Sequence, residues 1–373
     1  MDISPVKKTT ELETFIQNLN NNDQPIILSS SSSPKTHPIL GPKVINSWNA
    51  KKFLNAQMKG KVFTSDSNNF LYSNDTNEQI TENNYLNFDQ FLEKAVKLES
   101  DDKNHYYFQE PLSQKLVNTE IFQDFQQFDW SFLRSCSKNF GPLTKNVIFI
   151  SAVKNVNNGN DPKIKSQLHF DEQHNIFCQI KGTKKILLFP PSQYTNLYPY
   201  PAYSKYDRQS SIRNITEIIK SKSHNPEIFK KSIESKEFPK LKLLQGAQLA
   251  ELSAGEVLFI PSYWWHEVET TSRSADDSLV DKFGSLRLNV SLNFWYREKQ
   301  TQSQEIQNVI SRKDSKNDFD AKTFIRISRN IEKLLSKIVA NPETDYLPFL
   351  RLMMETTQKS EEEDKNPMTL IDL

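Results

Sequence analysis

A long stretch of this chain, from Val147 to Tyr296, alternates short apolar runs with turns, and no other feature constrains the fold as strongly. The runs are rich in β-branched and aromatic residues and end at Gly, Pro or polar clusters, as strands do. Many short strands joined by turns predict a sandwich or barrel of the jelly-roll type, so the predicted fold class is mainly β. The expected strands are 147–150, 168–180, 184–189, 247–252, 256–260 and 286–296.

Helical spacing of apolar residues flanks these strands on both sides. On the N-terminal side we expect helices at 11–19, 44–58 and 88–98, and one strand at 25–28. On the C-terminal side, Ile327, Ile331, Leu334 and Leu335 lie on one helical stripe. The predicted organisation is an α/β flanking region (1–105), a β domain (106–300) with an insert at 211–245, a helical region (318–356) and a disordered tail (357–373).

Charge and composition exclude several classes of protein. Lys and Arg number 47 against 46 Asp and Glu, so no global basic field favours phosphate binding and nucleic acid is not an expected partner. Segment 205–242 is locally basic, with a net charge of +5, and we expect a solvated helical insert there. Cys136 and Cys178 are too few for a disulfide framework and suit a reducing compartment. Without a secretory signal or an apolar span of about 18 residues, we expect a soluble protein of the cytoplasm, with the nucleus as a second compartment, and no membrane contact.

The first chemical signal is a polar row in segment 167–175. Strand alternation puts His169, Asp171, Gln173 and Asn175 on one face, and such a row must meet solvent, a ligand or a metal. A His and an Asp two apart on a strand can reach one ion. Taken alone, this pair occurs often by chance and is a weak signal.

The second signal lies further along the chain, where a Gly turn and an apolar strand end in Pro261 and two tryptophans precede His266. Taken singly, His266 is as well explained by a hydrogen-bonded core histidine. Two His and one Asp from separate strands of one barrel, however, form a facial triad that leaves up to three coordination positions open. That arrangement suits non-haem Fe(II), whereas zinc more often takes a third nitrogen or sulfur ligand.

Several motifs together resemble the JmjC/cupin class of 2-oxoglutarate oxygenases. They are His169-x-Asp171, Gln179-x-x-Gly182-x-Lys184, Ile260-Pro261-x-x-Trp264-Trp265-His266 and Asn293-Phe294-Trp295-Tyr296. A further set is similar to the asparaginyl hydroxylases typified by factor inhibiting hypoxia-inducible factor: Asp171-Glu172-Gln173, Leu197-Tyr198-Pro199-Tyr200-Pro201, Asp207-Arg208-Gln209-Ser210 and Arg329-Asn330-Ile331-Glu332-Lys333.

The resemblance implies a double-stranded β-helix (jelly-roll/cupin, JmjC) catalytic core with flanking helices, and a role for each matching residue. Fe(II) would be held by His169, Asp171 and His266, with 2-oxoglutarate and O2 as cosubstrates. The cosubstrate-binding residues would be Tyr107, Ser166, Asn175, Lys184 and Asn293. The substrate-binding residues would be Gln109, Arg208, Gln209 and Trp295. Independently, an ammonium inside a barrel needs an anionic partner, which supports the role of Lys184.

The predicted function is asparaginyl hydroxylation of ankyrin-repeat or transcription-factor-type protein segments, with succinate and CO2 as coproducts. The resemblance also implies a homodimer through the C-terminal helices. Two alternatives remain: a JmjC oxygenase acting on another side chain, including a lysine demethylase, and a non-catalytic cupin binding module. The insert at 211–245 and the loop at 270–285 exceed the family pattern, so they leave the substrate open.

Overall fold

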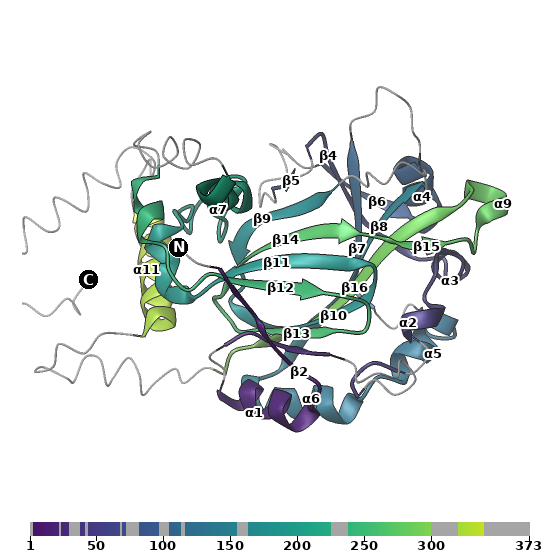
Figure 1. The fold of residues 1–373 in the computed structure, drawn as a ribbon, viewed down its shortest axis with the longest axis horizontal. Helices are drawn as coiled ribbons and strands as arrows, with labels where there is room; N and C mark the ends of the chain where they lie inside the picture. The colour runs from purple at the N-terminus through teal and green to yellow at the C-terminus, as the bar shows by residue number, and fades with distance from the viewer. Residues whose placement is uncertain are drawn as a thin grey trace, which may run out of the picture.

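Two β-sheets form the body of the molecule and face each other (Figure 1). The computed structural model describes residues 3–21, 24–29, 38–41, 44–67, 69–71, 82–96, 104–112, 116–154, 163–224, 238–299 and 320–338. Within them, one sheet has six strands in the order β1-β12-β11-β14-β9-β5. The other has the order β2-β3-β13-β10-β16-β8-β7-β4-β6, with β15 also paired to β16. The jelly-roll core predicted from the sequence is confirmed.

The strands of the predicted β domain pair with one another in antiparallel fashion, and the N-terminal region adds strands at the edges of both sheets, of which β1 and β5 run parallel to β12 and β9. The flanking region predicted at 1–105 is therefore built into the sheets. The six-stranded sheet contains β1 (Ser4–Pro5), β5 (Asn69–Phe70), β9 (Ile164–Phe170), β11 (Thr183–Phe189), β12 (Gln248–Leu252) and β14 (Trp265–Ser272). The larger sheet contains β2 (Lys7–Thr9), β3 (Ile26–Leu28), β4 (Lys59–Ser65), β6 (Glu82–Asn87), β7 (His105–Glu110), β8 (Leu143–Lys154), β10 (Gln173–Lys181), β13 (Val257–Ile260), β15 (Ser274–Asp276) and β16 (Leu286–Arg297).

The N-terminal helices cover the outer face of the larger sheet and bury its apolar residues in the main core cluster. A second apolar cluster lies at the far end of the barrel, under η2, α7 and α11. Beyond 338, the predicted helical region and tail lie outside the described residues, as do 225–237 of the insert. The helices are α1 (Leu12–Asn21), α2 (Val44–Ser47), α3 (Ala50–Asn55), α4 (Phe88–Val96), α5 (Glu120–Gln126), α6 (Trp130–Phe140), η2 (Pro191–Asn196), α7 (Ile215–His224), η3 (Pro239–Leu243), α9 (Val280–Phe283) and α11 (Ala321–Ile338).

The structure corrects two of the predicted elements. The single helix expected at 44–58 is two short helices, because Asn49 adopts an extended conformation and caps α3 by accepting a hydrogen bond from the backbone N–H of Lys52. The single strand expected at 168–180 is broken after Phe170 into β9 and β10, which belong to different sheets. Asp171 lies in that break, so its alignment with His169 comes from a turn between sheets and not from strand alternation.

The strand expected at 286–296 is present as β16, and its side chains alternate between two faces. Leu288, Val290, Leu292 and Phe294 enter the main apolar core. The residues between them face the space between the two sheets, where Asn293 and Trp295 line a cavity. Because this strand spans the barrel, one face stabilises the fold while the other supplies polar groups to the interior.

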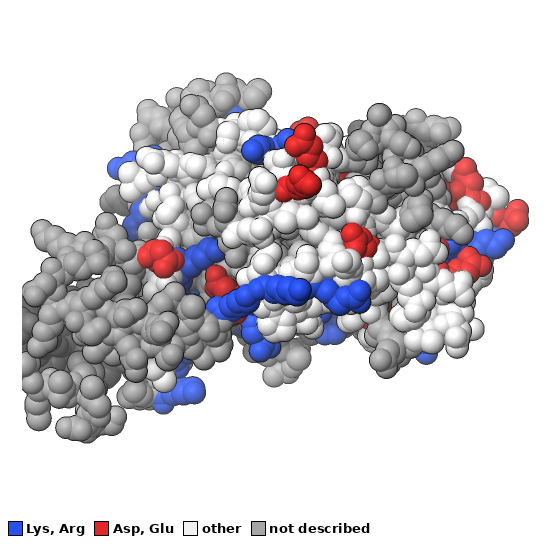
Figure 2. All heavy atoms as spheres, turned by 90° about the horizontal axis from the view of Figure 1, so that it is seen from below, with Lys and Arg blue, Asp and Glu red and all other residues white. Residues whose placement is uncertain are grey.

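Basic and acidic side chains are interspersed over the face that Figure 2 shows, apart from a short row of Lys and Arg at its centre. Among the described residues, no helix combines the length and the apolar character that crossing a membrane requires.

Candidate metal centre and cosubstrate cavity

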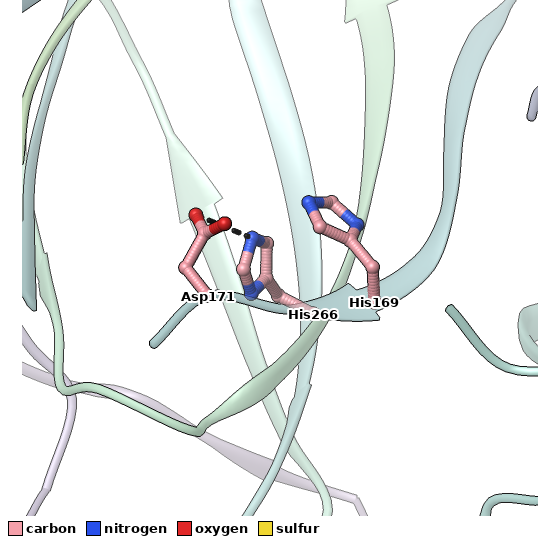
Figure 3. Close-up of side chains that lie close together, drawn as sticks. All are labelled: His169, Asp171 and His266. Carbon is pink, nitrogen blue, oxygen red and sulfur yellow. Dashed lines mark ion pairs between the residues drawn. The ribbon is translucent and has the colours of Figure 1, made fainter. Parts of the chain in front are cut away.

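Three side chains converge where β9 and β14 run side by side. His169 and His266 are directly opposite each other in this antiparallel pair, and Asp171 follows the end of β9. Figure 3 shows the carboxylate and both imidazoles gathered in one place, and their ligand atoms lie within 4.8 Å of one another. The structure thus brings together the three residues that the sequence predicted as metal ligands.

Backbone carbonyls set the orientation of both imidazoles. Nδ1 of His169 lies 2.6 Å from the carbonyl oxygen of Gln167, and Nδ1 of His266 lies 3.0 Å from that of Trp264. A carbonyl only accepts, so each Nδ1 carries the proton and each Nε2 keeps its lone pair. This is the tautomer that a metal ligand requires, with the second ring nitrogen anchored behind it.

The protonation states also suit metal binding. Burial and the neighbouring His266 lower the pKa of His169 to about 4, so its imidazole is neutral at pH 7. Burial works against ionisation of Asp171, but the interactions with His266, His169 and Arg208 and the hydrogen bond from Trp295 together outweigh it and hold the pKa of this carboxyl below its usual value. Trp295 donates its indole N–H to Oδ2 of Asp171 at 2.9 Å, and the Arg208 guanidinium lies 3.7 Å from Oδ1. The carboxylate is therefore ionised and held from behind.

A cavity of about 240 Å³ opens between the two sheets beside this triad. All twelve residues predicted as ligands, cosubstrate-binding or substrate-binding line it, although they come from both sheets and from the loop after η2. They are Tyr107, Gln109, Ser166, His169, Asp171, Asn175, Lys184, Arg208, Gln209, His266, Asn293 and Trp295.

Lys184, on β11, is the buried cation of this cavity. Its side chain is almost fully enclosed, and its ammonium donates to the hydroxyls of Tyr107 (2.8 Å) and Ser291 (3.2 Å). Among the described residues, no carboxylate lies within ion-pair distance of it. Burial, helped by the charge of Arg273, lowers the pKa of Lys184 to about 7. A cation left in this state is an incomplete ion pair.

The donors of the cavity fit Fe(II) and 2-oxoglutarate. Two imidazoles and one carboxylate form the nitrogen and oxygen set that Fe(II) accepts. Lys184 offers a charge to a distal carboxylate. In addition, the side-chain oxygens of Asn175 and Asn293 are buried without a hydrogen-bond partner among the described residues. Buried polar atoms rarely stay unpaired, so these two amides are further positions at which a bound polar molecule would be held.

Sequence reasoning placed Ser166 beside the cosubstrate carboxylate, and the structure places it on the cavity wall. The second hydroxyl that accepts a hydrogen bond from Lys184 belongs to Ser291 instead, a residue that the sequence analysis did not single out. Its position two residues before Asn293, on the same face of β16, was the available signal. Lys145 was also missed. Its ammonium lies 4.5 Å from the ring centroid of Trp295 at the cavity wall, and no motif around it marks this role.

The loop that carries Arg208 and Gln209 lines the cavity near the His-Asp-His triad. Gln209 forms an isolated β-bridge with His169, and the backbone N–H of Phe170 donates to the carbonyl of Arg208 at 3.1 Å. Arg208 has a φ of 66°, which is strained for a residue with a side chain. The loop is therefore fixed to the strand end that holds the His-Asp-His triad.

Comparison with known proteins identifies the family to which this architecture belongs. A profile described as "Cupin-like domain" matches residues 4–302, which is most of the chain. The chain belongs to the cupin-like family. The cupin-like chain is 29% identical over 139 residues to "Lysine-specific demethylase JMJ31" of Arabidopsis thaliana, covering 37% of this chain and 20% of that protein. It is 26% identical over 256 residues to "Lysine-specific demethylase JMJ30" of the same organism, covering 67% of this chain and 46% of that protein.

A third relative matches along nearly its whole length. "JmjC domain-containing protein E" of Dictyostelium discoideum is 23% identical over 327 residues, covering 80% of this chain and 84% of that protein. The cupin-like chain spans less than half the length of the two demethylases. Oxygenases of the JmjC class use Fe(II) and 2-oxoglutarate, and this chain carries a His-Asp-His triad in the corresponding fold.

Proposed function

We propose that the protein is an Fe(II)- and 2-oxoglutarate-dependent oxygenase that hydroxylates a protein side chain, most specifically the β-carbon of asparagine. One observation carries the proposal: a two-His, one-carboxylate triad and an incompletely paired buried lysine line the same cavity. When bound, Fe(II) and 2-oxoglutarate supply oxygen activation, with succinate and CO2 as coproducts. The residues of this chain bind, orient and shield the reacting groups.

Contacts between side chains of the protein would orient the residues that act in the cavity. Lys184 would bind the distal carboxylate of 2-oxoglutarate, with its ammonium aimed by the hydroxyls of Tyr107 and Ser291. Trp295 would keep Asp171 ionised and oriented through its N–H. The aromatic rings of Phe149 and Phe177 line the same cavity and would limit the access of water.

The asparaginyl specificity is supported by the polar groups of the cavity wall. Gln109, Arg208 and Gln209 line the cavity from β7 and from the loop after η2, beside the triad. A side-chain amide presents one acceptor and one donor to a primary amide, so two hydrogen bonds of fixed polarity would aim a single β-carbon. The expected substrates are extended segments of ankyrin-repeat or transcription-factor-type proteins.

The test is mass spectrometry of an Asn-containing ankyrin-repeat peptide after incubation with the protein, Fe(II), ascorbate and 2-oxoglutarate. We expect a gain of one oxygen on the Asn, with stoichiometric succinate, and no gain with Asp171→Ala. Succinate formation that persists in Asp171→Ala would overturn the assignment of the metal ligand. A wild-type protein that consumes 2-oxoglutarate but leaves every Asn peptide unmodified would retain the oxygenase class and exclude asparagine.

Lysine demethylation is the second candidate, favoured by the names of the two Arabidopsis relatives. The same incubation with trimethyl-lysine peptides decides between them. Loss of a methyl group, with formaldehyde as coproduct, would favour demethylation over asparagine hydroxylation.

We also propose that α11 forms a homodimer contact. Phe324, Ile331 and Leu334 are exposed on this helix, between 45% and 60%, which is unusual for large apolar side chains grouped on one helix. The partner would be a second copy of the chain, in agreement with the homodimer predicted from the sequence.

A further inference from the structure

The inward face of α11 makes contacts that its predicted role in a dimer does not need. The helix lies at the end of the barrel, beside η2 (Figure 1). Ile325 is fully buried in the second apolar cluster together with Phe170 and Trp265. One turn further along, Arg329 also points inward. The run that contains Arg329 was part of the sequence resemblance, but no function was attached to it.

Arg329 is held by two carboxylates and one ring, although its side chain is only 2% exposed. Its guanidinium donates to both oxygens of Asp207, at 2.6 and 2.9 Å, and to Glu172 at 3.3 Å. Its Cζ lies 5.2 Å from the ring centroid of Phe170. Burial works against the charge, but the bonds and charge of Asp207 outweigh it and raise the pKa of Arg329 above its ordinary value. The bidentate fork fixes the direction of both partners.

The partners of Arg329 adjoin the groups proposed to act in the cavity. Phe170 lies between His169 and Asp171 in the sequence, and Glu172 follows Asp171. Asp207 immediately precedes Arg208. A single side chain from α11 therefore contacts both the strand end that bears the metal ligands and the loop that bears the proposed substrate-binding pair.

The loop needs such support because its own backbone is strained. Arg208 has positive φ, and only a surrounding structure that over-determines this conformation keeps it populated. The loop is tied down on its other side by hydrogen bonds from Tyr200 N–H to the carbonyl of Gln209 and from Ala202 N–H to Glu332 of α11. Of the contacts that hold this loop to α11, the pair formed by Arg329 and Asp207 joins two charged side chains.

We infer that Arg329 is a positioning residue of the active site, which acts from α11 by holding the Asp207–Gln209 loop against the end of β9. The C-terminal helix is then part of the substrate side of the cavity. The inference rests on the proposed function for its kinetic consequences, but its structural content does not depend on the substrate. Substrate binding should be affected more than the chemical step, because the bidentate contact is to the substrate loop and the contact to Glu172 is single and longer.

The test compares Arg329→Lys with Arg326→Lys, the same chemical change one turn earlier on α11. Arg326 donates to Thr323 of its own helix. Lysine keeps the charge at 329 but cannot form the bidentate fork. For Arg329→Lys we expect the peptide KM to rise about tenfold and kcat to fall less than about threefold. Arg326→Lys should change neither quantity.

Hydrogen–deuterium exchange on the protein without peptide supplies the second measurement. In Arg329→Lys, amides of 198–211 should exchange faster, while those of β16 should keep wild-type rates. Exchange at 198–211 that matches the wild type would overturn the inference, as would an increase spread evenly over the chain. If Arg329→Lys does not fold, Asp207→Asn tests the same contact from the loop side and must show the same local change. Because exchange needs no turnover, a wild-type protein that hydroxylates no peptide would defeat the proposed function and leave this measurement decisive.

Discussion

Two cations of this protein are buried to the same degree but are paired differently. Lys184 and Arg329 are each about 2% exposed. Arg329 is bound by Asp207 and Glu172, and its pKa is raised. Lys184 has two hydroxyls and, among the described residues, no carboxylate within ion-pair distance, and its pKa is lowered to about 7.

The difference separates a charge that serves the fold from a charge that serves a ligand. A buried charge costs several kcal/mol in lost hydration, and Arg329 recovers this within the protein. Lys184 does not, so its lost hydration lowers the stability of the fold until an anion binds. Sites that violate the pairing rule in this way are where function is expected.

The largest effect is expected on cosubstrate binding. Lys184→Met removes the charge but roughly keeps the volume of the side chain. We expect the 2-oxoglutarate dissociation constant to rise at least about hundredfold, because a buried charge-assisted pair contributes about 3–5 kcal/mol when one partner is removed. Calorimetric titration with the metal present checks this. An affinity within tenfold of the wild type would show that Lys184 does not bind the carboxylate of 2-oxoglutarate.

The same substitution by Met at Arg329 should lower the stability of the protein. Arg329→Met leaves Asp207 and Glu172 without their partner, so the free energy of unfolding should fall by about 3–5 kcal/mol. Urea denaturation measures the difference, and Lys333→Met, at an exposed position of the same helix, controls for the loss of a positive charge. A loss below about 1 kcal/mol would mean that the two buried cations are not distinguished by their pairing.

The ligand-free stability of Lys184→Met should move in the opposite direction. Without an anion the lysine is a net cost, so its replacement by Met should raise the free energy of unfolding by about 1–2 kcal/mol. The same denaturation series without 2-oxoglutarate tests this. A variant that is less stable than the wild type would mean that the two hydroxyls already satisfy the ammonium.

A pH dependence follows from the lowered pKa of Lys184. The unfolded chain keeps this lysine protonated up to about pH 10.5, whereas the ligand-free folded protein releases the proton near pH 7. The unfolded state therefore binds more protons between these values, so this group raises stability as pH increases through that window. The slope should be absent in Lys184→Met. The same release of the proton predicts weaker 2-oxoglutarate binding as pH rises above about 7, and a flat affinity from pH 6 to 9 would contradict it.

The smallest effect on stability is expected at the outer face of α11. Leu334 is 60% exposed, so Leu334→Arg should change the free energy of unfolding by no more than about 0.5 kcal/mol. If α11 forms the proposed dimer, the sedimentation coefficient should nevertheless fall to that of a monomer. Unchanged sedimentation would exclude this interface while leaving the inward role of Arg329 untouched.

Much of the cavity could be predicted from the sequence because its residues lie in short local motifs. Short motifs around His169, Asp171 and His266 carry the resemblance to JmjC oxygenases, and the same resemblance implies the roles of Asn293 and Trp295. Such motifs are local, so a single sequence records them. The break at Asp171 was missed because a continuous polar and apolar alternation passes through it, while only the pairing of β9 and β10 in different sheets reveals the turn.

Contacts between distant segments could not be predicted in the same way. Ser291 reaches Lys184 across the two sheets, and Arg329 reaches Asp207 from a helix more than a hundred residues further on. By itself, the sequence determined the β architecture, because strand periodicity is a property of neighbouring residues. Through the family resemblance, its motifs also predicted the metal-ligand set and the lysine. The tertiary structure alone decided which buried cation is neutralised by the protein and which is left for a ligand, because pairing depends on which side chains meet after folding.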